Sequence, residues 1–397
     1  MNAYIKLLRE EQNFRLLSIV QLICYFGAWF SHTGIFTLLI NLDAPIWAIT
    51  LSAAMAYLPA VILAPFSGVL IDRVSAKPML IIMMMIETIT VFMLVFIDSL
   101  DYLWLLLMLI FIRMGTGTIT FQAEMSLLPK ILSSENLKLA NEIHSIIWAV
   151  SYTAGMGLAG IYIHFFGIKS AFILDGIIYI CSFYFIFELN LPKIAKELTE
   201  PSLVMLKNGL KYLKSNPLIL HLIVLHGFVG ITAYDALVAL LADYPYANVL
   251  SVSLVIGFIN ATRSISLMFA PMLLSKFVRK DNLVYFYLGH GIGVLAWAML
   301  QFNFYISLIG ILAAGFFTST LWSYTYTLIQ QNCDEKFYGR VIAYNDMFFL
   351  SVSVITSLAV GYLFKLGINL QLITALMGAM FFVGAVYYHK IYKAYKL

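Results

Sequence analysis

The sequence predicts an all-α membrane protein with twelve transmembrane helices in two pseudo-symmetric halves of six. Three observations support this. Of the 397 residues, 62% are hydrophobic and only 11% are charged, and the mean hydropathy is +0.92. Apolar segments of about 20 residues, long enough to cross a bilayer, recur along the whole chain. Because a backbone in lipid must satisfy its own hydrogen bonds, and no alternating strand pattern is present, these segments are expected to be helices.

The expected spans are separated by short polar connections. They fall at roughly 15–40, 47–71, 78–98, 102–125, 143–165, 170–190, 217–242, 249–275, 282–303, 305–330, 339–364 and 368–388. The polar start runs directly into the first span without a cleavage site, so no removed signal peptide is expected.

The distribution of Lys and Arg predicts the orientation. If the amino terminus is cytoplasmic, the basic residues outside the spans lie in cytoplasmic segments, apart from Lys169 and Lys365. We therefore expect a multi-pass protein of the bacterial cytoplasmic membrane with both termini in the cytoplasm.

A polar linker divides the chain. Residues 191–216 are rich in charge, and leucines at helical spacing predict a short amphipathic helix there. We expect an amino-terminal bundle over 1–190 and a carboxy-terminal bundle over 217–397. The segment His164–Ile168 is echoed by Phe364–Ile368, 200 residues later, which is typical of an internal repeat.

A cluster of charge follows the second span. Its landmarks are Gly68, Leu70, Asp72, Arg73 and Lys77. This pattern resembles the signature loop between the second and third helices of the major facilitator superfamily of secondary transporters. The resemblance implies a gating role for Gly68, Asp72, Arg73 and Lys77, with Asp72 latching onto the start of the eleventh span near Arg340.

Two further segments resemble the branch of this superfamily that holds macrolide, multidrug and siderophore exporters. One is Leu127–Lys130 with the glycines of the fifth span, and the other is Gly339–Val341 with Gly361 and Gly367. The resemblance covers essentially the whole chain.

Ionisable residues within spans are the candidates for chemistry, because each costs several kcal/mol unless it pairs or meets water. Glu87 and Arg113 fall at matching depths in the third and fourth spans, which predicts an ion pair. The pair would either take part in proton coupling or serve only to align two adjacent helices. Arg113 with Gly117 also resembles the superfamily's fourth-helix motif, whose arginine is associated with proton coupling.

Asp235 in the seventh span is the strongest candidate for a proton carrier, because a desolvated carboxyl is suited to that task. The alternative is a carboxylate hydrated at the outer surface. Arg263 lies at mid-depth in the eighth span. His32 could titrate, bind a metal or simply hydrogen-bond a neighbouring helix.

The other acidic residues near span ends are given structural roles. Glu124, Glu142 and Asp346 are expected to be helix caps or partners of loop arginines, and Asp175 a feature of architecture.

Aromatic residues on the central spans suit a large amphipathic substrate, although most aromatic residues of a membrane protein serve lipid packing. The resemblance to the superfamily puts these spans around the cavity and, with the polar candidates, implies a substrate cavity of Tyr25, Trp29, His32, Tyr234, Arg263, Trp322 and Tyr326.

These observations predict a secondary transporter that works by alternating access, with Asp235, Glu87 and Arg113 coupling proton influx to the efflux of drug-like compounds. The alternatives are an exporter of a siderophore or transition metal, a lysophospholipid transporter, and a membrane sensor. The three cysteines and seven histidines show no metal spacing, no phosphate-binding loop is present, and no nucleophile is paired with a base. We expect a monomer in the bilayer with a small-molecule substrate and protons as partners, and no enzyme activity, cofactor, metal or nucleic acid.

Overall fold

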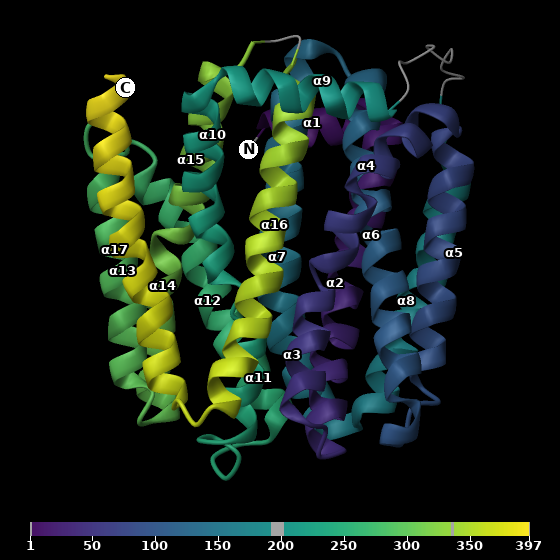
Figure 1. The fold of residues 1–397 in the computed structure, drawn as a ribbon. Helices are drawn as coiled ribbons and strands as arrows, with labels where there is room; N and C mark the ends of the chain where they lie inside the picture. Colours follow the sequence, from purple (N-terminus) through teal and green to yellow (C-terminus); the bar gives the residue numbers. More distant parts are fainter. Residues whose placement is uncertain (1, 192–201, 335–336, 397) are drawn as a thin grey trace. The chain divides into compact units, whose positions relative to one another are not determined.

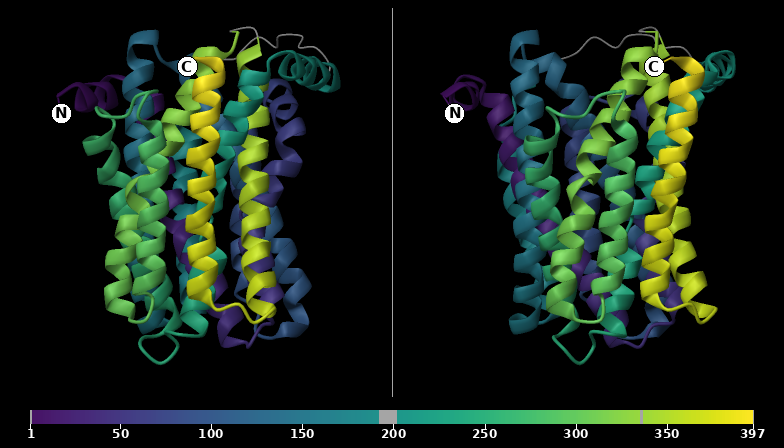
Figure 2. Two further views of the ribbon diagram at one scale, coloured as in Figure 1. Left: turned by 60° about the vertical axis from the view of Figure 1, so that its left-hand side comes forward. Right: turned by 90° about the vertical axis from the view of Figure 1, so that its left-hand side faces the viewer.

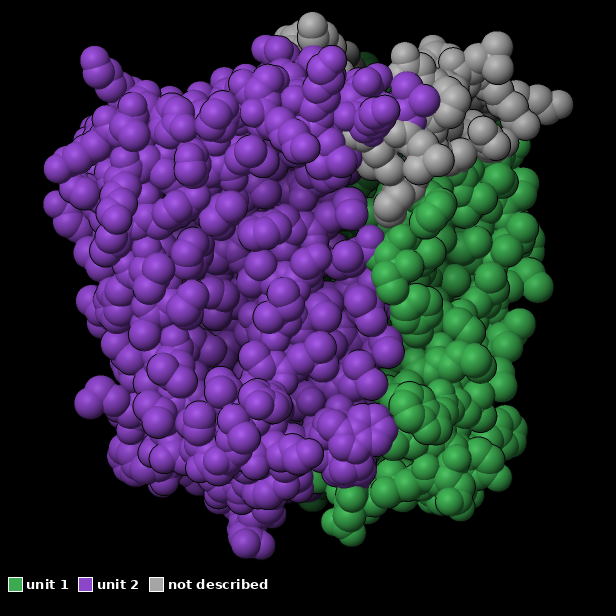
Figure 3. Space-filling view, viewed as in Figure 1, with its two compact units in different colours: residues 1–43, 62–200 green, residues 44–61, 201–397 purple. Residues whose placement is uncertain are grey.

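The computed structural model describes residues 2–191, 202–334 and 337–396. It is 86% helical, and no strand occurs within those residues. Two compact units are present, one of residues 1–43 and 62–200 and the other of residues 44–61 and 201–397 (Figure 3). The predicted division into halves at 190 and 217 stays a prediction, and residues 192–201 of the expected linker lie outside the described residues.

Unit 1, the first of these, is built mainly from five long helices that run side by side (Figure 1). They are α2 (Gln12–Asn41), α5 (Ala76–Leu94), α6 (Leu103–Ile131), α7 (Ser134–Phe166) and α8 (Ile168–Glu188). The short helices α1 (Asn2–Glu10) and η1 (Leu100–Tyr102) flank them. The central helix is α2, which packs against both α7 and α8, while α5 packs against α6 and α8.

Unit 2 contains the helices of the second half of the chain (Figure 2). They are α9 (Ser202–Ser215), α10 (Pro217–Gly227), η2 (Phe228–Thr232), α11 (Asp235–Asp243), α12 (Val252–Leu274), α13 (Leu283–Leu300), α14 (Phe304–Phe316), α15 (Thr318–Asn332), α16 (Tyr338–Lys365) and α17 (Leu370–Tyr395). Here α13 packs against α14 and α17, and α10 against α15 and α16. The helix expected in the linker is α9, which packs against α10 and α16.

The segment between residues 44 and 73 forms a bent span. It consists of α3 (Ile46–Met55) and α4 (Leu58–Arg73), and α3 meets the Leu58–Ala64 part of α4 at 42°. α3 packs against α11 and α16 of unit 2. Gly361 of α16 permits this approach, because a Cβ there would lie 2.5 Å from Thr50 Oγ1.

The spans agree with the sequence-based expectation. Among the described residues, eleven helical segments are long and apolar enough to cross a membrane, or twelve if α3 and α4 form one span. Each predicted span has its helix or pair of helices. The predicted all-α, twelve-span membrane fold is therefore confirmed.

The internal repeat has a structural counterpart at two turns. Gly167 separates α7 from α8, and Gly367 separates α16 from α17. Their φ angles are 83° and 87°, in the region where a side chain would be strained. The two related loops thus reverse the chain with the same backbone device.

Candidate functional site

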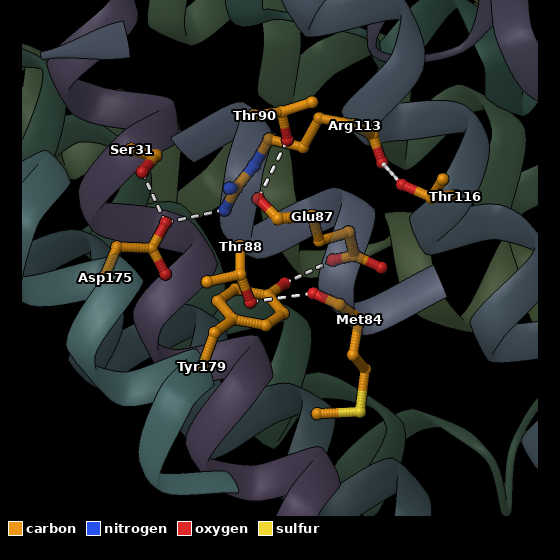
Figure 4. A network of polar contacts seen from close by, with 9 residues as sticks. All are labelled: Ser31, Met84, Glu87, Thr88, Thr90, Arg113, Thr116, Asp175 and Tyr179. Atoms are coloured by element: carbon orange, nitrogen blue, oxygen red, sulfur yellow. Dashed lines mark hydrogen bonds and ion pairs between the residues drawn. The ribbon is translucent and has the colours of Figure 1, made fainter. Parts of the chain in front are cut away.

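A buried ion pair joins α6 to α8 in unit 1. Arg113 Nη2 lies 2.6 Å from Asp175 Oδ2, and the two side chains are 6% and 0% exposed. Ser31 of α2 donates its hydroxyl to the same carboxylate oxygen (Figure 4). Helices α2 and α8 come this close because Gly27, one turn before Ser31, has no side chain, and a Cβ there would lie 2.7 Å from Asp175 Oδ1.

Glu87 of α5 belongs to the same polar cluster through other partners. Tyr179 of α8 donates its hydroxyl to Glu87 Oε2 (Figure 4). Thr120 of α6 donates to Glu87 Oε1 at 3.2 Å. The Tyr179 ring centroid also lies 5.5 Å from Arg113 Cζ. The recorded hydrogen-bond donors of Glu87 are thus neutral, and one of them also lies beside the arginine.

The expected direct pair between Glu87 and Arg113 is replaced by the pair between Arg113 and Asp175. Depth along a helix axis can be read from the sequence, but the direction in which a side chain points around that axis depends on packing. Arg113 points towards α8, so the carboxylate that we had given an architectural role is its partner.

Glu124 forms a second buried site that sequence reasoning missed. Its side chain is 1% exposed. Gln21 Nε2 and the Tyr25 hydroxyl, both on α2, donate to Glu124 Oε2 at 3.0 and 3.1 Å. Gln21 Oε1 in turn lies 3.2 Å from His144 Nδ1. Glu124 had been interpreted as a helix cap because the fourth span was expected to end at residue 125, whereas α6 continues to Ile131.

Aromatic and imidazole rings on α2 and α7 form what we call the aromatic stripe, defined as Tyr25, Trp29, His32, His144, Trp148 and Tyr152. Ring centroids of Trp29 and Tyr152 are 4.5 Å apart, and those of Trp148 and Tyr152 are 5.2 Å apart. Trp29 also contacts His32 at 5.6 Å. The structure thus brings together the three cavity candidates of the first span. His144, Trp148 and Tyr152 of α7 recur every four residues, which places them on one face of a helix. This spacing was the sequence signal that could have identified them as cavity candidates.

Unit 1 therefore buries more carboxyl groups than basic groups. Among the described residues of this unit, the buried ionisable acids and bases of the spans are Glu87, Glu124, Asp175 and Arg113. Three carboxyl groups accompany one guanidinium.

The seventh span is broken at its middle, and Asp235 stands at the break. The chain passes from α10 through η2 and resumes as α11, of which Asp235 is the first residue. The dipole of α11 favours a negative charge at this position. The Tyr57 hydroxyl donates to Asp235 Oδ2 at 2.7 Å. The predicted proton carrier thus lies within a span beside a neutral donor.

Arg263 of α12 supports the same break. Its Nη2 donates to the Thr232 carbonyl oxygen at 2.9 Å, at the end of η2. Its Cζ lies 4.7 Å from the centroid of Tyr234, whose ring also contacts Trp297 at 5.1 Å. Tyr234 is fully buried, so in this structure it packs within unit 2 rather than lining an open surface.

The other two cavity candidates of unit 2 lie together on α15. Trp322 and Tyr326 stack with centroids 5.2 Å apart, and Trp322 is 43% exposed. Buried His226 of α10 contacts both rings and pairs through Nδ1 with Thr325 Oγ1 at 2.8 Å. This histidine was not singled out from the sequence.

The expected gating residues are only partly described. Lys77 Nζ donates to the carbonyl oxygens of Phe187 and Leu189 at 2.7 Å, so it caps the end of α8. Arg340 lies near the start of α16, with its Cζ 5.5 Å from the Phe337 ring. Gly68 and the side chains of Asp72 and Arg73 lie outside the described residues, although the backbone of α4 includes them.

The described residues contain no group of three or more His, Cys, Asp or Glu side chains that could hold a metal ion. His32, a candidate ligand in the metal-exporter alternative, packs between Trp29 and Phe36.

Residues 17–357 match the family model described as Major Facilitator Superfamily. The chain therefore belongs to this superfamily. It is 26% identical over 220 residues to "Uncharacterized MFS-type transporter YfiS" of Bacillus subtilis (strain 168), a match that covers 54% of this chain and 52% of that relative. It is also 26% identical over 159 residues to "Putative bacilysin exporter BacE" of the same organism, with 40% of each chain covered.

Solved structures of similar fold include the nucleoside transporter NupG, with a TM-score of 0.71 and 15% identity over 99% of this chain and 100% of that one. The POT family transporter PepTSo gives a TM-score of 0.74, with 10% identity over 97% of this chain and 98% of that one. At such identities the likeness shows the fold alone. The family match and the candidate membrane spans make the chain a multi-pass membrane protein of this superfamily.

Proposed function

We propose that this transporter exports amphipathic small molecules in exchange for protons, by alternating access of two six-helix halves. The observation that carries the proposal is the excess of carboxyl groups over basic groups within the described spans of unit 1. A charge in a membrane span costs several kcal/mol unless it is paired. Arg113 neutralises Asp175, so Glu87 and Glu124 each require a proton or another cation.

Asp235 is the residue we assign to carry the exchanged proton. It lies at the break of the seventh span, where α11 and Tyr57 stabilise its ionised form. Substrate that enters the cavity would favour one protonation state over the other and so couple the two fluxes. Glu87, with Arg113 held by Asp175, would tune this exchange in unit 1.

The direction of transport is supported by a relative whose name reads putative exporter. The solved neighbours of similar fold are named nucleoside and peptide transporters, so the fold leaves the substrate class open. We place the protein in the bacterial cytoplasmic membrane, as a monomer with both termini in the cytoplasm. Asp72, Arg73, Lys77 and Arg340 would form the cytoplasmic latch.

The proposal is tested in energised everted membrane vesicles that contain the full chain. A pH-sensitive dye reports the lumen while cationic amphiphiles, siderophores, metal ions and lysophospholipids are added in turn. We expect alkalinisation of the acidified lumen with cationic amphiphiles, because their uptake would release protons. Asp235→Asn should abolish the response, and Asp98→Asn, which changes an exposed aspartate, should leave it intact.

Three results would contradict the proposal. Uphill transport by Asp235→Asn at the wild-type rate would remove Asp235 from coupling. A response to siderophores or metal ions alone would favour a dedicated exporter. Silence with every compound, in folded protein, would favour an uncoupled route such as lysophospholipid movement.

A further inference from the structure

Glu124, like Glu87, has neutral hydrogen-bond donors and no ion pair with an arginine, but only one of its two carboxylate oxygens receives the recorded bonds. Both recorded hydrogen bonds, from Gln21 and Tyr25, end on the single oxygen Oε2. Among the described residues, the ion pairs that the structure shows do not include Glu124. The other oxygen, Oε1, is therefore the atom that a bound cation would contact.

The hydrogen bonds around Glu124 have a defined direction. In the arrangement shown, Gln21 Oε1 lies 3.2 Å from His144 Nδ1. An amide oxygen can only accept, so the histidine nitrogen donates, and Gln21 then donates to Glu124. Tyr25 donates from the other side. Gln21 and Tyr25 thus donate to Glu124, and His144 orients the Gln21 amide, which suits a carboxylate that is negatively charged when a cation is present.

Aromatic rings lie next to this carboxylate. His144 contacts the rings of Tyr25 at 6.1 Å and Phe121 at 5.5 Å. Phe121 and Trp148 are 42% and 43% exposed, and Tyr25 and His144 are half-buried. Tyr, His and Trp have polar edges, so this surface is unlike the purely apolar face that a helix presents to lipid. Ring faces attract ammonium groups, and the aromatic stripe continues along α2 and α7 for a flat apolar body.

We infer that Glu124 and the aromatic stripe bind an amphipathic amine, with the ammonium group at Glu124 Oε1 and the apolar body along the stripe. This inference rests on the proposed transport of amphipathic molecules and specifies their charge. A proton and the ammonium group would compete for the same carboxylate, so this site excludes one when it holds the other.

The test uses two fluorescent probes that differ in one charge. Dansylcadaverine carries a primary ammonium group, and its N-acetylated form is neutral. Binding to the purified full chain in detergent is measured by fluorescence at pH 8 and pH 6. We expect the wild type to prefer the amine by at least about tenfold, which corresponds to one charge-assisted hydrogen bond. Binding of the amine should weaken at pH 6.

Two variants isolate the carboxylate. Glu124→Gln should bind both probes equally and lose the effect of pH on amine binding. Glu142→Gln is the matched control, because Glu142 also lies in unit 1 but accepts its hydrogen bond from Tyr4 of α1. The control should keep the wild-type preference.

A labelling experiment on the wild type tests the same site without depending on the folding of a variant. Dicyclohexylcarbodiimide modifies buried carboxyl groups, and mass spectrometry identifies the modified peptide. We expect dansylcadaverine, but not its acetylated form, to protect Glu124.

Equal binding of the two probes by the wild type, or unprotected Glu124, would overturn the inference. Retained preference in folded Glu124→Gln would also overturn it. These measurements need no proton gradient, so they stay decisive even if the vesicle assay shows no proton exchange.

Discussion

Replacing Asp175 by Asn tests whether the buried ion pair stabilises unit 1. Arg113 Nη2 and Asp175 Oδ2 are 2.6 Å apart with almost no exposure. At an effective dielectric constant of about 20, this separation gives an attraction of about 6 kcal/mol. Desolvation of both groups offsets much of that, but removing one partner leaves the other charge buried, at a cost of about 3–5 kcal/mol. Asn keeps the size of the side chain and an acceptor for Ser31.

The free energy of unfolding is measured by titration with sodium dodecyl sulfate in mixed micelles. We expect Asp175→Asn to lose about 3–5 kcal/mol, and Arg113→Met combined with Asp175→Asn to recover most of the loss, because no unpaired charge then stays buried. The control is Glu10→Gln, which breaks an exposed pair with Lys6 and should change nothing measurable. A loss below about 1 kcal/mol in Asp175→Asn, or no recovery in the double variant, would refute the reasoning.

Two further predictions concern unit 2. Gly361→Ala should destabilise the protein by about 1–3 kcal/mol, because its Cβ would lie 2.5 Å from Thr50 Oγ1. Adding Thr50→Ala to this variant should partly restore the melting temperature. An unchanged melting temperature in Gly361→Ala alone would contradict the close approach. Arg263→Lys should lower the free energy of unfolding by about 1.5–3 kcal/mol, because Lys cannot reproduce the guanidinium hydrogen bond to the Thr232 carbonyl oxygen. Amide hydrogen exchange at the break of the seventh span should become faster. Exchange at residues 228–235 at the wild-type rate would show that the arginine does not support the break.

Part of the candidate site could be anticipated from the sequence. Arg113, Glu87 and Asp235 were singled out because ionisable residues are rare in apolar segments, and the structure places all three within spans. Tyr25 and Trp29 were expected in the cavity because the first span lines it in the superfamily that the sequence resembles, and His32 because it is an ionisable residue within a span. What could not be anticipated was which neighbouring helix each side chain meets.

The role expected for Glu124 depended on where the fourth span was expected to end. The fourth span was expected to end at residue 125, but α6 continues to Ile131 with Pro129 in its last turn, where a proline removes only one hydrogen bond near the helix end. A residue expected at the membrane surface is thereby buried among Gln21 and Tyr25.

From the sequence alone, the class of fold and the number and order of the spans could be predicted. They follow from hydropathy over windows of about 20 residues, which is a short-range property. Only the tertiary structure decided that Arg113 pairs with Asp175, that Glu124 faces Gln21 and Tyr25, and that α3 packs against α16. Those outcomes depend on how each helix is rotated about its axis, which is fixed by packing between residues far apart in the chain.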